Sequence, residues 1–87
     1  MEKRNLEIAR VEWEKLNQEF QNRNGEVLYN LALTYEAIGN LGIANNIYKQ
    51  AYQVSKNPNH LKIISFAITR TGENMEQKIK AKSQLPN

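Results

Sequence analysis

The chain has no cysteine among its 87 residues, and only two prolines, four glycines and one histidine. The absence of cysteine excludes disulfide bonds, thiol nucleophiles and zinc sites built on thiolates. The single histidine, His60, has neither a cysteine nor a carboxylate pair near it in the sequence, so we expect no metal site and no general base. Because the sequence also lacks a nucleophile paired with a base and a glycine-rich phosphate loop, we expect neither a cofactor nor an enzyme activity.

Long apolar runs are missing as well. Charged residues interrupt the N-terminal segment 1–10, which therefore lacks the roughly 7 to 15 apolar residues of a secretion signal. The longest uncharged stretch, Ala37 to Tyr48, is short and rich in glycine and asparagine, so we expect no membrane span. These absences predict a soluble, cytoplasmic protein, unless the chain was cut from a longer exported one.

Positive charge is concentrated in the C-terminal third of the chain. Residues 1–55 carry six basic and seven acidic side chains, whereas residues 56–87 carry six basic and two acidic ones. The excess is either a solvated, lysine-rich helix or a patch that binds nucleic acid, an acidic protein or an anionic membrane surface, and the first is the simpler interpretation. The patch would consist of Lys62, Arg70, Lys78, Lys80 and Lys82.

Apolar residues recur at spacings of three and four in three successive segments, a pattern typical of one face of an α-helix. The predicted helices run from about residue 2 to 22, from 26 to 38 and from 43 to 54. Gly39 is suited to the left-handed exit from the second helix. The link from Gly39 to Gly42 is short enough to force the second and third helices to pack as antiparallel neighbours.

The C-terminal part predicts a fourth helix that starts at Pro58 or Asn59 and carries a broad apolar band. Thr71 and Gly72 are expected to interrupt it. The tail that follows forms its own helix, continues the fourth helix or frays. We therefore predict an all-α fold of about four antiparallel helices, with one domain over residues 1–72 and a basic helix or tail over residues 73–87.

The second and third predicted helices carry a spaced motif. It reads Leu28-x₂-Leu31-Ala32-x₂-Tyr35, then Gly39, then Ala44-x₃-Tyr48-x₂-Ala51, with Pro58 after it. This motif resembles the tetratricopeptide repeat, which is a pair of antiparallel helices. Small alanines let two helices approach closely where they cross, while the tyrosines fill the volume beside them.

The flanking helices resemble parts of further repeats. Ala9-x₃-Trp13-x₂-Leu16 mirrors the Ala44 segment at an offset of 35 residues, as the second helix of a truncated repeat would. At the same offset, Ile63, Phe66 and Ala67 match the start of the motif, but its second half has no copy after them. The resemblance therefore implies a short right-handed α-solenoid fragment whose fourth helix ends the stack.

In this family the first helix of each pair lines a concave groove that takes a peptide or a partner helix. The resemblance places these residues on that face: Glu26, Tyr29, Asn30, Leu33, Glu36 and Ala37. Asn30 is either a ligand contact or a locally bonded polar residue. The positions that would supply the cations of a carboxylate-binding groove are Leu61, Ile64, Ser65 and Ile68, so no such clamp is expected.

A chain with about two repeats falls short of the three or so that give a continuous core, so we expect self-association or docking on a larger assembly. Possible interface residues are Trp13, Tyr52, Ile64 and Ile68, and Trp13 is alternatively a core residue. The sequence therefore predicts a protein-interaction module. The alternative is an electrostatic binder of nucleic acid or an acidic partner, for which no recognised motif is present.

Overall fold

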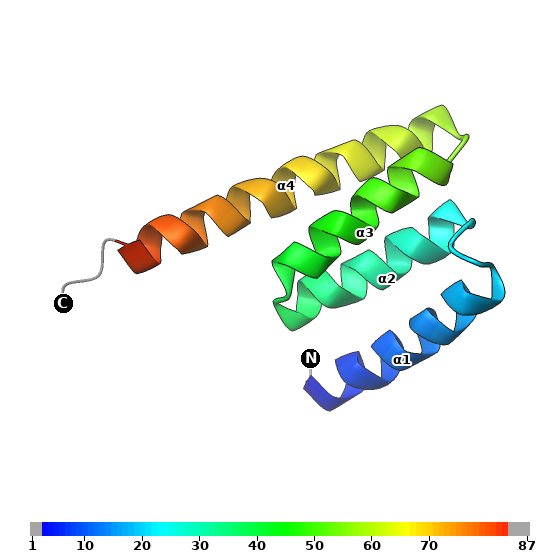
Figure 1. Cartoon of the computed structure of the whole chain (residues 1–87), viewed down its shortest axis with the longest axis horizontal. Helices are drawn as coiled ribbons and strands as arrows, with labels where there is room; N and C mark the ends of the chain where they lie inside the picture. Colours follow the sequence, from blue (N-terminus) through cyan, green and yellow to red (C-terminus); the bar gives the residue numbers. More distant parts are fainter. Residues whose placement is uncertain (1–2, 84–87) are drawn as a thin grey trace.

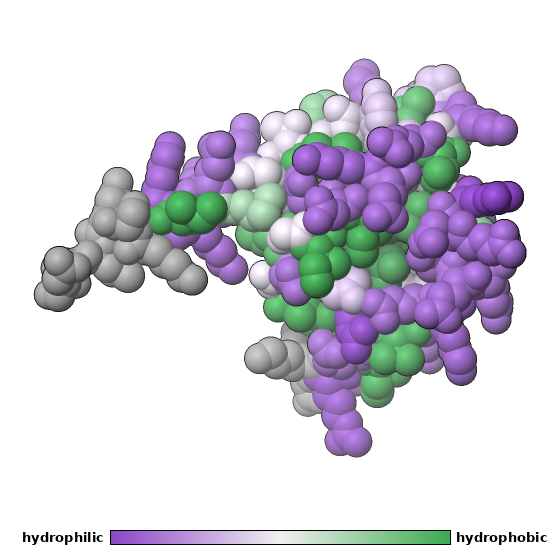
Figure 2. All heavy atoms as spheres, viewed as in Figure 1, coloured by the Kyte–Doolittle hydropathy of each residue, from purple (hydrophilic) through white to green (hydrophobic). Residues whose placement is uncertain are grey.

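The computed structural model describes residues 3–83, and within this range every regular element is an α-helix, as predicted. The helices are α1 (Lys3–Glu19), α2 (Gly25–Ile38), α3 (Leu41–Val54) and α4 (Pro58–Ser83). Figure 1 shows them in chain order, each antiparallel to the next, with the C-terminal part of α4 projecting beyond the others. None of these helices is long and apolar enough to cross a membrane. In Figure 2, apolar residues gather over the centre of the stack and polar residues cover most of its ends.

The turn between α1 and α2 begins earlier than predicted. Helix α1 ends at Glu19 because Gln21 and Asn22 take left-handed backbone conformations, with φ of 56° and 60°. Asn24 then caps α2, since its side-chain oxygen accepts from two backbone N–H groups of the first turn at 3.0 and 3.2 Å. A glycine follows this cap at once, and α2 starts there.

The turn between α2 and α3 confirms the predicted role of Gly39. This glycine has a φ of 100°, and its N–H donates to the carbonyl groups of Tyr35 and Glu36. Asn40 immediately caps α3 by accepting from the N–H of Ile43 at 3.3 Å. Helix α3 therefore starts two residues before its predicted position, and a two-residue link holds α2 and α3 antiparallel.

The core lies between α2, α3 and α4. The motif positions that are fully buried in this core are Leu28, Ala32, Ala44, Tyr48 and Ala51, while Leu31 is buried but lies outside the cluster. Helix α4 adds Ile64 and Ala67 to them. Helix α1 contributes no fully buried apolar side chain within the described residues, since Trp13 and Leu16 are half-buried. The core is therefore thin and centred on the α2–α3 pair.

The predicted interruption at Thr71 and Gly72 is wrong, because α4 continues through both residues to Ser83. Thr71 is fully buried, and its hydroxyl donates to the carbonyl of Ala67 at 2.8 Å. The side-chain amide of Asn45 on α3 donates to the Thr71 hydroxyl at 2.9 Å and to the carbonyl of Ile68 at 3.0 Å. The threonine is thus a packing residue between two helices, and the tail continues α4.

Candidate binding surface

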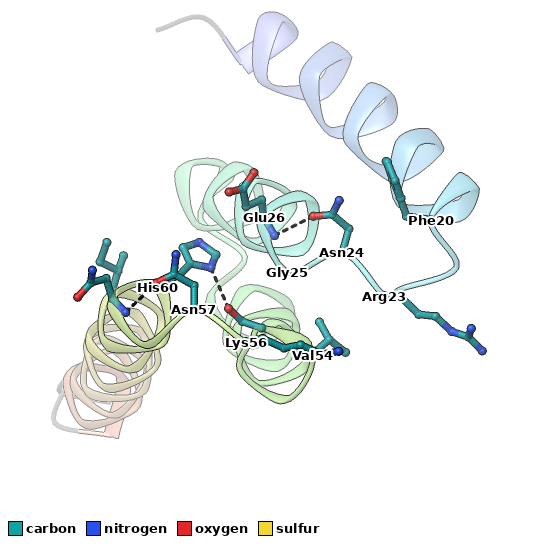
Figure 3. Close-up of a pocket in the computed structure, with 12 residues that line it drawn as sticks. Phe20, Arg23, Asn24, Gly25, Glu26, Val54, Lys56, Asn57 and His60 are labelled. Atoms are coloured by element: carbon teal, nitrogen blue, oxygen red, sulfur yellow. Dashed lines mark hydrogen bonds between the residues drawn. The ribbon is translucent and has the colours of Figure 1, made fainter.

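Side chains of α2 contact side chains of α4 directly, although α3 lies between these two helices in the sequence. Figure 3 looks along these helices and shows α2 and α4 on one side, with α1 and α3 on the other. The rings of Tyr29 and His60 meet edge to face at 5.3 Å, and Glu36 forms an ion pair with Arg70. We call this side, defined by Tyr29, Leu33, Glu36, Ala37, His60 and Arg70, the α2–α4 face.

Three rings form the aromatic part of the α2–α4 face. Tyr29 is half-buried and packs against Tyr48 at 5.6 Å between ring centroids, as well as against His60. His60 in turn lies 3.2 Å from the Ser55 hydroxyl, measured from its Nδ1 atom. Aromatic pairs of this geometry add stability beyond their buried area. The two contacts hold the Tyr29 ring in place, a role for His60 that its isolated position in the sequence did not indicate.

Glu36 is the centre of a polar cluster on the same face. Arg70 donates to its two carboxylate oxygens through Nε at 2.8 Å and a terminal nitrogen at 2.7 Å, and the Tyr48 hydroxyl donates at 2.7 Å. The hydrogen bonds from Arg70 lower the pKa of Glu36, burial opposes that shift, and the Tyr48 hydroxyl adds to it. Burial raises the pKa of Tyr48, and the carboxylate raises the pKa of Arg70. Such bidentate pairs are the stronger kind of charged hydrogen bond.

The Glu36–Arg70 pair makes stability depend on pH in a defined direction. Because the pKa of Glu36 is lowered in the folded state, the pair's contribution to stability is complete above the ordinary pKa of a glutamate and is lost as pH falls through the lowered pKa. Arg70→Met should lower the free energy of unfolding by roughly 1 kcal/mol at pH 7, a figure discounted because the arginine is partly exposed. Urea unfolding at pH 7 and pH 3 measures this difference.

The difference in free energy of unfolding between the wild type and Arg70→Met should be smaller at pH 3 than at pH 7. Lys62→Met, which removes an exposed lysine from the same helix, is the control and should show no comparable narrowing. A gap of equal size at both pH values would contradict the proposed contribution of the Glu36 carboxylate.

A second cluster of the same residue types joins α1 to α2. The Tyr35 hydroxyl donates to Glu14, and Arg10 donates to Glu14 at 2.9 Å and to Glu7 at 3.0 Å. Burial, followed by the hydrogen bond to Glu14, raises the pKa of Tyr35. The Arg10 guanidinium also lies 6.0 Å from the centre of the Tyr35 ring. The cluster adds polar contacts between α1 and α2 to the packing of half-buried apolar side chains such as Trp13 and Leu16.

The remaining predicted groove residues differ in accessibility. Leu33 is half-buried and packs against the core, whereas Glu26 and Ala37 are exposed. Asn30 is half-buried, and its carbonyl accepts from the Thr34 hydroxyl at 2.9 Å. One side of α2 thus presents a line of residues four positions apart, the half-buried Tyr29 and Leu33 and the exposed Ala37.

A hollow of about 590 Å³ lies at the end of the stack where α2 and α4 begin and α3 ends (Figure 3). Its lining includes Phe20, Arg23, Glu26, Val54, Lys56 and His60. Both helix N-termini at this end are capped by asparagine side chains, Asn24 and Asn57. We therefore assign the hollow no ligand. Nowhere in the described part of the chain do three side chains of the metal-binding types come together.

The predicted interface residues do not form one surface. Ile64 is fully buried at the α3–α4 contact and is a core residue, so its assignment to an exposed interface is wrong. Ile68 is half-buried and packs against the same core. Trp13 on α1 is half-buried, and Tyr52 on α3 remains 46% exposed.

The predicted basic residues are also separated. Arg70 is paired with Glu36, while Lys62, Lys78 and Lys80 are exposed on α4. Lys62 and Lys78 are sixteen residues apart on one helix, which corresponds to about 24 Å. The side chain of Lys82 lies outside the described residues. The lysines thus follow a long helix and do not surround a common site.

Comparison of the chain with protein-family models, curated proteins and solved structures found no match. Its function is therefore inferred from its own geometry. That geometry is an all-α stack with one well-packed helix pair, an aromatic and ionic face across α2 and α4, and apolar residues exposed on its outer helices.

Proposed function

We propose that the protein is a tetratricopeptide-like interaction module whose α2–α4 face binds a peptide or a helix of a partner protein. One observation carries the proposal: the apolar motif residues of α2 and α3 are buried together, and α4 returns to the side of α2. This arrangement leaves two neighbouring helices with a shared surface that no other described part of the chain covers. Such a surface suits an extended peptide or an amphipathic helix.

The chemistry of the face supports this function. Tyr29, Leu33 and Ala37 offer an apolar line along α2, and the small side chain of Ala37 leaves room for a ligand. The Glu36–Arg70 pair lies beside this line and offers a hydrogen-bonding edge. Because the Tyr29 ring is already held by two other rings, binding would cost little side-chain entropy. We therefore expect ligands with apolar side chains flanked by polar or charged ones.

Peptides selected from a random library against the wild-type protein would test this function. Ala37→Arg places a bulky charge on the face at an exposed position, so it should preserve the fold and weaken the selected peptides about tenfold or more, equivalent to roughly 1.4 kcal/mol. Gln53→Arg, at an exposed position on α3, is the matched control and should leave affinity almost unchanged. Fluorescence anisotropy measures both affinities.

Circular dichroism would establish that both variants keep the helical content of the wild type. Equal binding to wild type and Ala37→Arg would place the peptide site elsewhere. Loss of binding caused by Gln53→Arg alone would assign the site to α3 and contradict the proposal.

A further inference from the structure

The turn between α1 and α2 contains the one asparagine–glycine step of the sequence, Asn24–Gly25. An asparagine amide is thermolabile, because the backbone nitrogen of the next residue can attack its side-chain carbonyl. A side chain on that next residue obstructs the approach, whereas glycine leaves it open and lets the backbone rotate. The sequence therefore offers this reaction its least obstructed position at Asn24.

The attacking nitrogen at this step is free. Within the described residues, the N–H of Gly25 donates no hydrogen bond, as expected at the first position of a helix. Asn24 and Gly25 also line the hollow at the end of the stack, so solvent reaches both of them (Figure 3). The nucleophile and the water that the reaction needs are thus both available.

The closed helix cap holds the reacting atoms apart. The Oδ1 atom of Asn24 accepts from the N–H groups of Glu26 and Val27 at 3.0 and 3.2 Å, which fixes the side-chain carbonyl over the first turn of α2. Ring closure requires the Gly25 nitrogen to eclipse the Cβ of Asn24 about the Cα–C bond, which corresponds to a negative ψ. Asn24 has a ψ of 111°, so the first turn of α2 must open before the nitrogen can attack.

The packing of α2 against α3 explains the glycine at this step. A Cβ atom at Gly25 would lie 3.1 Å from the Cβ of Ser55 and 3.3 Å from its Cα, so the end of α3 would have to shift. The close approach of the two helices therefore favours a glycine directly after the capping asparagine. The same pair of residues is the reactive step.

We propose that Asn24 is a site of spontaneous deamidation, controlled by opening of the first turn of α2. The Gly25 nitrogen gives its proton to solvent and bonds to the Cγ of Asn24, while the bond from Cγ to the amide nitrogen breaks and ammonia leaves with a proton from solvent. Water then opens the resulting cyclic imide. Its attack at Cγ gives aspartate, and its attack at the backbone carbonyl gives isoaspartate, whose main chain is one carbon longer. This proposal does not depend on peptide binding by the α2–α4 face.

The two products affect the helix cap in opposite ways. Aspartate at position 24 still accepts from the first turn, and its negative charge suits the N-terminus of α2. In isoaspartate the main chain runs through the former side chain, so the hydrogen bonds from Glu26 and Val27 are lost. The aspartate form should keep α2 as stable as in the wild type, whereas the isoaspartate form should fray at its first turn.

Mass spectrometry of peptides from protein incubated at mildly alkaline pH tests the proposal, since each deamidation adds one dalton. The wild type should gain this mass at Asn24 at least about fivefold more slowly in buffer than in urea, because only the folded protein must open its cap. Asn40 and Asn57 are internal controls, because they also cap helices but precede Leu41 and Pro58. Both should gain almost no mass.

Two variants and the isolated product complete the test. Asn24→Ser keeps a capping residue without an amide, so its peptide should gain no mass while circular dichroism shows the helix content of the wild type. Asn24→Asp reproduces one product and should unfold at no lower urea concentration than the wild type. The isoaspartate form, separated by chromatography, should exchange amide hydrogens faster than the wild type in the first turn of α2.

Several results would overturn the proposal. If Asn24 stays unchanged in the folded protein while the unfolded protein is converted, the native chain does not react at this site. Equal rates in buffer and in urea would exclude control by the cap, and an equal gain of mass at Asn40 would exclude the glycine step as the cause. An isoaspartate form as protected from exchange in α2 as the wild type would exclude the expected effect on the cap.

Discussion

Tyr48→Ala is expected to remove a large part of the protein's free energy of unfolding. Tyr48 is fully buried and is the largest side chain in the core between α2, α3 and α4. Truncating a buried aromatic residue costs about 3 to 5 kcal/mol because it removes buried area and leaves a cavity. A domain of this length has a total free energy of unfolding of only about 4 to 13 kcal/mol. A urea titration monitored by the helical circular dichroism signal would measure the loss of free energy of unfolding.

Two further tyrosine variants separate the contributions at this position. Tyr48→Phe keeps the ring but removes the hydroxyl that donates to Glu36, which stays paired with Arg70, so it should cost only about 1 kcal/mol. Tyr52→Ala removes a tyrosine that is 46% exposed on the same helix and should change stability by about 0.5 kcal/mol or less. Equal costs for the two alanine variants would contradict the central position of Tyr48.

Asn45→Ala should lower the free energy of unfolding by about 1 to 3 kcal/mol and weaken the attachment of α4. The asparagine is buried, and its amide supplies both the donor to the Ile68 carbonyl and the donor to the Thr71 hydroxyl. Removing a buried partner leaves polar groups without a hydrogen bond, which costs more than the bond itself contributes. Relative to the wild type, Asn45→Ala should increase the rate of amide hydrogen exchange more in α4 than in α2.

The matched control for this variant is Asn46→Ala, which changes the neighbouring, exposed asparagine and should be close to neutral. Thr71→Val combined with Asn45→Ala should cost less than the sum of the two single changes, because both remove parts of one network. Additive costs, or an Asn46→Ala variant as unstable as Asn45→Ala, would contradict the role of this contact.

The sequence predicted the α2–α3 pair well because its signals are local. Apolar spacing is a property of a single helix, and the short link at Gly39 determines how two such helices meet. The residues that the spacing assigned to the pair, from Leu28 to Ala51, include the centre of the buried core. The predicted helix ends were less accurate. Asn22 has a left-handed backbone conformation in the turn after α1, and apolar spacing does not reveal such a conformation.

Contacts between distant residues could not be derived in this way. Thr71 and Gly72 resemble a helix end in isolation, but α4 continues through them, and Thr71 is buried there in a hydrogen bond from Asn45. The pairing of Glu36 with Arg70 across 34 residues depends on how α4 packs, and no local pattern in the sequence indicated it. Ile64 was placed on a surface because a broad apolar band does not reveal which side faces α3.

The candidate face was predicted in part. The resemblance to the repeat family implied that Tyr29, Leu33 and Glu36 share one side of α2. The contributions of His60 and Arg70 to that side became visible only in three dimensions. That the face binds a partner stays a prediction. The same holds for the assignment to the repeat family.

The order in which the helices contact one another has a consequence for folding kinetics. Extensive packing occurs only between successive helices within the described chain, so native contacts can form without closing long loops. Proteins with such local topology fold in about microseconds to milliseconds. Because α1 is attached without a fully buried apolar residue and α4 projects beyond the stack, the ends can open while α2 and α3 stay paired. The chain should therefore unfold inward from both ends toward this central pair.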